Sequence, residues 1–263
     1  MKTPALQAAN GGVRIAYEVR GSGEPLLLMQ GLGYGRWGWE PVVGGFADEF
    51  RVLFYDNRGI GESDVPPGPY TARQLAEDAV AVLDAEGVER ADVVGASLGG
   101  MAAQELAIGF PDRVSRLVLV CTTPGGLTSH PMPRQTVELM LSAPTLPPET
   151  ALRRFVENAL APGASAELVE RILALRLANP FDPEGWQAQA AAGAAFDALD
   201  RLSRIEAPTL VVTGTEDVVV DPRNSELLAA TIPTARLERV PGGHLFFWED
   251  PDRFVTLVKE FLR

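Results

Sequence analysis

Short apolar runs and helical patterns alternate along most of this chain. The runs are continuous, which is typical of strands buried on both faces of a sheet. They occupy residues 24–30, 51–56, 92–94, 117–121 and 209–213. Apolar residues at helical spacing follow within 71–86, 101–110 and 254–261. Strands that alternate with helices predict an α/β fold, with a mostly parallel sheet covered by helices on both faces.

Two further segments predict strands of a different kind. Residues 13–19 alternate between apolar and charged side chains, which is the pattern of a strand with one wet face. Residues 236–240 are shorter and more polar than the central runs, as expected for a strand at the edge of the sheet.

The alternation breaks between residues 124 and 204. This stretch begins with several prolines and continues with helical patterns at 149–160, 165–178 and 184–202. We interpret it as a helical insertion, or lid, between two strands. Residues 1–123 and 205–263 then form the core to which the insertion belongs.

Composition and charge narrow the range of functions and locations that the chain can have. The net charge of −12 argues against a nucleic-acid partner, because phosphate backbones are held by clustered Lys and Arg. No apolar run approaches the ~20 residues of a membrane span, and residues 1–10 lack the pattern of a signal peptide. Cys121 is the only cysteine and the chain has two histidines, so we expect no disulfide and no structural zinc site. These features predict a cytoplasmic protein.

A serine lies at a strand-to-helix turn in the segment Gly95-Ala96-Ser97-Leu98-Gly99-Gly100. An apolar run precedes the segment and a helical pattern follows it. Glycines around such a turn let strand and helix approach closely, while the serine presents its hydroxyl above the helix N-terminus. Ser97 is therefore our candidate nucleophile.

A serine hydroxyl at neutral pH needs a base that accepts its proton. His244 follows two glycines just past the last expected strand, where a loop can carry its ring toward Ser97. His130, in the proline-rich start of the insertion, is the alternative base. We expect His244 to serve.

The base in turn needs an acid that orients it. Asp217 comes shortly after the apolar run that ends at Thr213, and it lies between Ser97 and His244 in the chain. Glu216 and Asp221 are the alternatives, and each could instead be a turn or helix-cap residue. The order Ser, Asp, His is that of hydrolases with a nucleophile elbow.

Attack on a carbonyl carbon places negative charge on its oxygen, which backbone N–H groups can stabilise without reorganising. We expect one donor to be the N–H of Leu98, at the helix N-terminus after the nucleophile. The segment Gly31-Leu32-Gly33 follows a buried strand, and the N–H of Leu32 is our second expected donor.

These motifs together resemble the α/β-hydrolase superfamily, in particular its lidded serine esterases and enol-lactonases. The resemblance spans nearly the whole chain. It rests on residues 30–33, 56–63, 95–100, 214–217 and 243–244. It implies an eight-stranded sheet with the lid inserted after the sixth strand. It also implies a cofactor-free carboxylic-ester hydrolase, without a metal, that acts on small or medium apolar esters or lactones through an acyl-enzyme.

One position departs from this family, which usually has histidine where this chain has Gln30. The side chain at that position commonly braces the oxyanion loop, and an amide can still form the hydrogen bond. We expect the loop to keep its function.

The pocket around the serine is harder to assign. Tyr34 and Trp37 of the oxyanion loop and Met132, Met140 and Phe155 of the insertion are candidates for its walls. The same side chains would also serve as ordinary packing, and the apolar surface of the insertion leaves self-association open.

Two other functions use the same residues. Hydrolysis of a carbon–carbon bond in a β-diketone would use the same machinery. A ligand receptor that turns over slowly can retain the triad as well.

Overall fold

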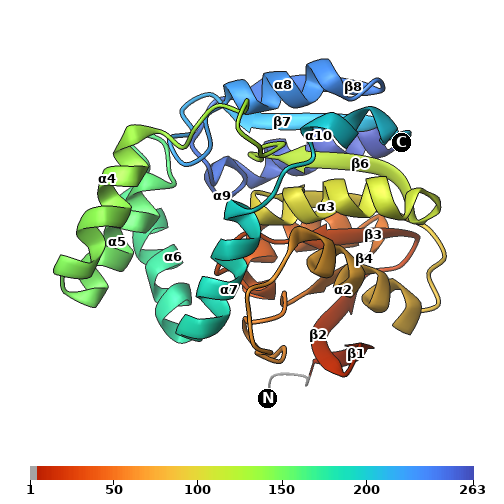
Figure 1. Ribbon diagram of the computed structural model, residues 1–263, viewed down its shortest axis with the longest axis horizontal. Helices are drawn as coiled ribbons and strands as arrows, with labels where there is room; N and C mark the ends of the chain where they lie inside the picture. The colour runs from red at the N-terminus through yellow and green to blue at the C-terminus, as the bar shows by residue number, and fades with distance from the viewer. Residues whose placement is uncertain (1–4) are drawn as a thin grey trace.

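A computed structural model describes residues 5–263 and contains one sheet of eight strands (Figure 1). The strand order is β1-β2-β4-β3-β5-β6-β7-β8. β2 pairs antiparallel with β1 and β4, and the remaining pairs are parallel. The strands are β1 Leu6–Asn10, β2 Val13–Arg20, β3 Glu24–Met29, β4 Phe50–Tyr55, β5 Ala91–Ala96, β6 Val114–Val120, β7 Thr209–Gly214 and β8 Ala235–Val240.

Helices cover both faces of the sheet, each over its own apolar core. On one face lie α2 Ala72–Ala85, α3 Leu98–Gly109 and α8 Arg223–Thr231. On the other lie α1 Glu40–Ala47, α9 Phe246–Glu249 and α10 Pro251–Leu262. The central strands contribute to both cores, which explains why they read as continuous apolar runs.

An inserted segment between β6 and β7 carries four α-helices: α4 Arg134–Ser142, α5 Pro148–Asn158, α6 Ala166–Ala178 and α7 Pro183–Ala194. Figure 1 shows them gathered at one end of the sheet. The two ends of the inserted segment are joined by backbone hydrogen bonds. Ala198 N donates to Pro124 O at 2.9 Å, Gly126 N donates to Phe196 O at 3.1 Å, and Gly125 forms a bridge with Asp197.

Over residues 5–263, four short 3₁₀ helices complete the secondary structure: η1 Arg36–Trp39, η2 Pro111–Arg113, η3 Ala143–Thr145 and η4 Leu199–Arg204. η4 packs against the core under α3, through the buried Leu202. The helix expected over 184–202 is therefore wrong in its second half. It ends at Ala194, because residues 196–198 pair with the start of the insertion.

The predicted α/β-hydrolase architecture is confirmed, and β8 is the polar edge strand that its sequence indicated. β1 and the helices α1, α4, α8 and α9 lie outside the segments predicted from the sequence. Among residues 5–263, no helix combines the length and the hydropathy that a membrane span requires.

Candidate active site

The residues predicted for the triad and the oxyanion hole lie where parallel strands end. The carboxyl ends of β3, β5, β7 and β8 lead into the loop 30–34, Ser97, the loop with Asp217 and the loop with His244. Carboxyl ends of neighbouring parallel strands meet at one edge of a sheet, which is where α/β folds hold their ligands. The order of strands thus gathers residues that are far apart in the chain.

Ser97 lies between β5 and α3 in a strained backbone conformation. Its φ is 53° and its ψ is −119°, which L-residues rarely adopt. The strain is held by the surrounding backbone. Ser97 N donates to Val120 O at 2.9 Å, and Ser97 O accepts from Gly100 N at 2.9 Å and from the Thr122 hydroxyl at 2.7 Å. The turn therefore keeps the half-buried serine side chain at the edge of the sheet.

Small residues around Ser97 are required by close contacts. A Cβ at Gly95 would lie 2.5 Å from the carbonyl oxygen of Gly99. A Cβ at Gly99 would lie 2.1 Å from the carbonyl oxygen of Met29 at the end of β3. At Gly31, a Cβ would come within 3.1 Å of the Ser97 Cβ. The loop at residues 30–34, the expected oxyanion loop, thus lies directly against the serine.

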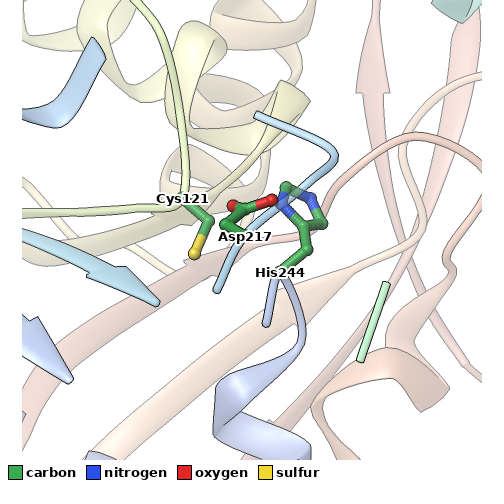
Figure 2. A group of neighbouring side chains, drawn as sticks. All are labelled: Cys121, Asp217 and His244. Carbon is green, nitrogen blue, oxygen red and sulfur yellow. The ribbon is translucent and has the colours of Figure 1, made fainter. Parts of the chain in front are cut away.

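Asp217 and His244 form a buried hydrogen-bonded pair. The distance from His244 Nδ1 to Asp217 Oδ2 is 2.8 Å (Figure 2). The other carboxylate oxygen, Oδ1, accepts from Val219 N at 2.8 Å and from Val220 N at 2.9 Å. A carboxylate with these donors acts as acceptor toward the ring, so Nδ1 carries the proton and Nε2 keeps its lone pair. This is the tautomer that a general base requires.

Cys121 lies on the other side of the Asp217 carboxylate from the imidazole (Figure 2). Within the described chain, these three residues form the one group of His, Cys, Asp and Glu whose ligand atoms are close enough for a metal, all within 4.8 Å. Burial raises the pKa of the Cys121 thiol well above its ordinary value, with the nearby Asp217 charge adding to the effect. Both carboxylate oxygens of Asp217 already have partners, one in the imidazole and the other in two backbone N–H groups, so we read this group as an Asp–His pair.

The oxyanion loop begins at Gln30, which is buried. Its Oε1 accepts from Gly31 N at 2.8 Å, so the amide braces the loop as the sequence predicted. The N–H groups of Leu32 and Leu98 make no hydrogen bond to any residue of 5–263. Both predicted donors therefore remain available to a ligand oxygen.

A comparison with known families decides the membership of this chain. The model of the alpha/beta hydrolase fold family matches residues 24–251. The chain belongs to that family.

Relatives of this α/β-hydrolase carry several different names. It is 33% identical over 261 residues to "Putative carbamate hydrolase RutD" of Azorhizobium caulinodans, covering 97% of each chain. It is 33% identical over 266 residues to a 2-hydroxy-6-oxo-6-phenylhexa-2,4-dienoate hydrolase of Comamonas testosteroni, covering 95% of this chain and 91% of that one. The solved enol-lactonase of Burkholderia xenovorans LB400 superposes with a TM-score of 0.85 at 29% identity, over 98% and 99% of the two chains.

The alternative base and acids of this α/β-hydrolase lie in other surroundings than the Asp217–His244 pair. His130 exchanges two 2.9 Å hydrogen bonds between its backbone and the side chain of Asn224. Asp221 pairs with Arg223, which holds the pKa of that carboxyl below its usual range. Glu216 is exposed. Of the sequence candidates, the structure joins Asp217 to His244.

The predicted wall residues occupy two different environments. Tyr34 is buried and packs against Trp37 at a tilt, with 4.8 Å between ring centroids, and Phe155 is half-buried on α5. Met132 and Met140 are 44% and 43% exposed at the surface of the insertion. Their place in a substrate pocket remains a prediction.

A cavity of about 360 Å³ lies on the outer side of the oxyanion loop. Gly33 and Trp37 line it together with Arg36, Glu62 and Phe181, whereas the three triad candidates do not. It is therefore a neighbour of the loop and separate from the serine.

Proposed function

We propose that this chain is a serine hydrolase that cleaves a carboxylic ester or lactone of a small-to-medium apolar substrate. The proposal assigns Ser97 as nucleophile, His244 as general base and acid, and Asp217 as the group that orients the imidazole. It assigns the oxyanion to the N–H groups of Leu32 and Leu98. The observation that carries it is the 2.8 Å bond from His244 Nδ1 to Asp217, at the sheet edge that also presents the strained Ser97.

The first half of the reaction forms an acyl-enzyme. Ser97 Oγ attacks the carbonyl carbon while its proton passes to His244 Nε2, and the carbonyl oxygen becomes the oxyanion. When the tetrahedral intermediate collapses, the bond to the leaving oxygen breaks and His244 gives its proton to that oxygen. For a lactone, the released hydroxyl or enol stays attached to the acyl group.

The second half reverses the roles. Water attacks the acyl-enzyme and gives a proton to His244, and the second tetrahedral intermediate expels Ser97 Oγ. His244 returns the proton to the serine, and the carboxylic acid leaves. Each step uses only groups of this chain, the substrate and water.

The relatives named above suggest which bonds to compare. Their names specify a carbamate, a 2-hydroxy-6-oxo-dienoate, which contains no ester or lactone, and an enol-lactone. We propose ester or lactone cleavage first, because the two free N–H donors and the Asp217–His244 pair serve acyl transfer directly. Carbon–carbon cleavage of a β-diketone is the second candidate, supported by the dienoate hydrolase at 33% identity.

The test is a panel of nitrophenyl esters, lactones, carbamates and β-diketones of graded chain length. It is run on the wild type, on Ser97→Ala and on the exposed-turn control Ser22→Ala. We expect sustained ester or lactone turnover that falls by roughly 10⁴- to 10⁶-fold in Ser97→Ala and is unchanged in the control. A fluorophosphonate should modify Ser97 alone.

Other outcomes would redirect the proposal. Equal turnover by Ser97→Ala and the wild type would remove the serine mechanism. A single slow turnover with ligand-dependent stabilisation would favour the receptor. Preferred cleavage of a β-diketone or carbamate would keep the triad and change the substrate class.

A further inference from the structure

Helix α7 of the inserted segment is docked on the core beside the oxyanion loop. Gly185, in its first turn, meets Gly59 so closely that a Cβ at Gly185 would lie 2.1 Å from the Gly59 carbonyl oxygen. Tyr70 N donates to Ala188 O at 3.2 Å. Figure 1 shows α7 as the inserted helix next to the core. This close approach brings Gln189, one turn further along α7, to the loop.

Gln189 links the oxyanion loop to a second core loop. It is fully buried, and its Oε1 accepts from Gly33 N at 3.2 Å. Its Nε2 donates to Arg58 O at 2.7 Å. Because one partner is a donor and the other an acceptor, the amide has only one productive orientation. Arg58 is itself fixed by a double hydrogen bond to the buried Asp78.

Arg176 of α6 holds the other peptide group of Gly33. Its Nη1 donates to Gly33 O at 3.3 Å, and its guanidinium carbon lies 3.9 Å from the centroid of the Tyr34 ring. Gly33 has a φ of +71°, one of several conformations open to glycine, so its hydrogen-bond partners help to select it. Both polar groups of Gly33 are therefore bound by the insertion.

Within the loop at residues 30–34, the N–H of Leu32 has no partner in the part of the chain that the structure describes, whereas the N–H groups of its neighbours Gly31 and Gly33 are hydrogen-bonded. Gln30 binds Gly31 N from the sheet side, and Gln189 binds Gly33 N from the insertion side. Leu32 lies between them, and its N–H is one of the two donors assigned above to the oxyanion. We propose that the inserted segment completes the oxyanion hole, with Gln189 and Arg176 as positioning residues that aim Leu32 N–H. This inference rests on the proposed function.

The alternative is that the inserted segment only covers the substrate and does not position the oxyanion donor. Measurements of KM and kcat distinguish these two roles. A cover contributes to substrate and transition-state binding alike, so its loss raises KM. A displaced oxyanion donor loses stabilisation in the transition state alone, so its loss lowers kcat.

The experiment uses two matched pairs of variants. Gln189→Met keeps the side-chain shape and removes both hydrogen bonds, and its control is Gln187→Met on the exposed side of the same helix. Arg176→Gln removes the contact with Gly33. Its control, Arg171→Gln, removes a contact between α6 and Glu40 of the core that does not touch the loop.

We expect Gln189→Met to lower kcat by about 10- to 100-fold, the scale of a misplacement near 1 Å, with a KM change under about threefold. Binding of a trifluoromethyl ketone, whose adduct with Ser97 carries the oxyanion, should weaken by the same factor as kcat. Arg176→Gln should act in the same direction, about three- to tenfold, and both controls should match the wild type.

Unchanged kcat and inhibitor binding in both test variants would overturn the inference, as would a rise in KM alone. Equal losses in Arg176→Gln and Arg171→Gln would also overturn it, since they would show a general tether. If Gln189→Met does not fold, the half-buried Arg176 pair decides. Absence of Ser97-dependent turnover in the wild type is a separate result that removes the proposed function itself.

Discussion

Replacing Asp217 by asparagine tests the proposed base through its tautomer. The substitution leaves the size of the side chain unchanged. Oδ1 of Asp217 accepts from the backbone N–H groups of Val219 and Val220. The asparagine oxygen must stay at those two donors, because an amide NH₂ cannot accept from them. The NH₂ group then faces His244 Nδ1.

The consequence is an imidazole protonated on the wrong nitrogen. The NH₂ group donates to Nδ1, so the ring proton moves to Nε2, and Nε2 can no longer accept the proton of Ser97. In serine hydrolases with the same triad such a change lowers kcat by about 10⁴-fold. That factor corresponds to about 5 kcal/mol of lost transition-state stabilisation.

Ester turnover measures the loss, and NMR of isotope-labelled histidine reports the tautomer directly. The chain has only two histidines, so the His130→Gln variant assigns both signals. Glu216→Gln and Asp221→Asn are matched controls, since they test the acids that compete with Asp217 in sequence. Turnover of Asp217→Asn within tenfold of the wild type, or a larger loss in either control, would refute the reasoning.

Two further predictions concern stability. Burial raises the pKa of Asp92 to about 6. Between pH ~4 and 6 the folded state therefore holds a proton that the unfolded state has released. The free energy of unfolding falls as pH rises through that window. The substitution Asp92→Asn removes the cost of ionising this buried carboxyl. In urea unfolding, its free energy of unfolding should exceed that of the wild type by about 1–2 kcal/mol at pH 7, after allowance for solvent screening, and by little at pH 4. An equal gain at both pH values would contradict the prediction. Gly99→Ala should lower both stability, by about 1–3 kcal/mol, and ester turnover, because its Cβ would lie 2.1 Å from the Met29 carbonyl oxygen. Gly44→Ala, in an exposed and open part of α1, is its control and should stabilise by about 0.5–1 kcal/mol in the same assay.

The sequence was sufficient to predict the sheet and the Asp217–His244 contact for one reason. Asp217 and His244 each lie in the loop that follows an expected strand, and parallel strands end at a shared edge, so local pattern and topology together determine the neighbourhood. The sequence pattern did not predict β1, because Ala8 is the only buried residue of that strand. α1 escaped because its adjacent glycines, Gly44 and Gly45, weaken the helical pattern.

The supports of the oxyanion loop could not be predicted in this way. Gln189 lies in an alanine-rich helix whose composition does not mark one face as special. Its role depends on the meeting of Gly59 and Gly185, which are 126 positions apart, and no short-range pattern encodes such a meeting. The early end of α7 has a similar origin, since backbone pairing at Gly125 outweighs the helix propensity of the following residues.

The joined ends of the inserted segment make it an exchangeable cassette. Residues 124–126 and 196–198 form their own backbone hydrogen bonds, so the sheet meets the same two anchor points whatever sequence runs between them. The roughly seventy residues between these anchor points could therefore be exchanged as one unit, provided that their contacts with the core, such as those to Gly33, Asn224 and Leu245, are kept. Grafting experiments in the laboratory have the same natural cut points.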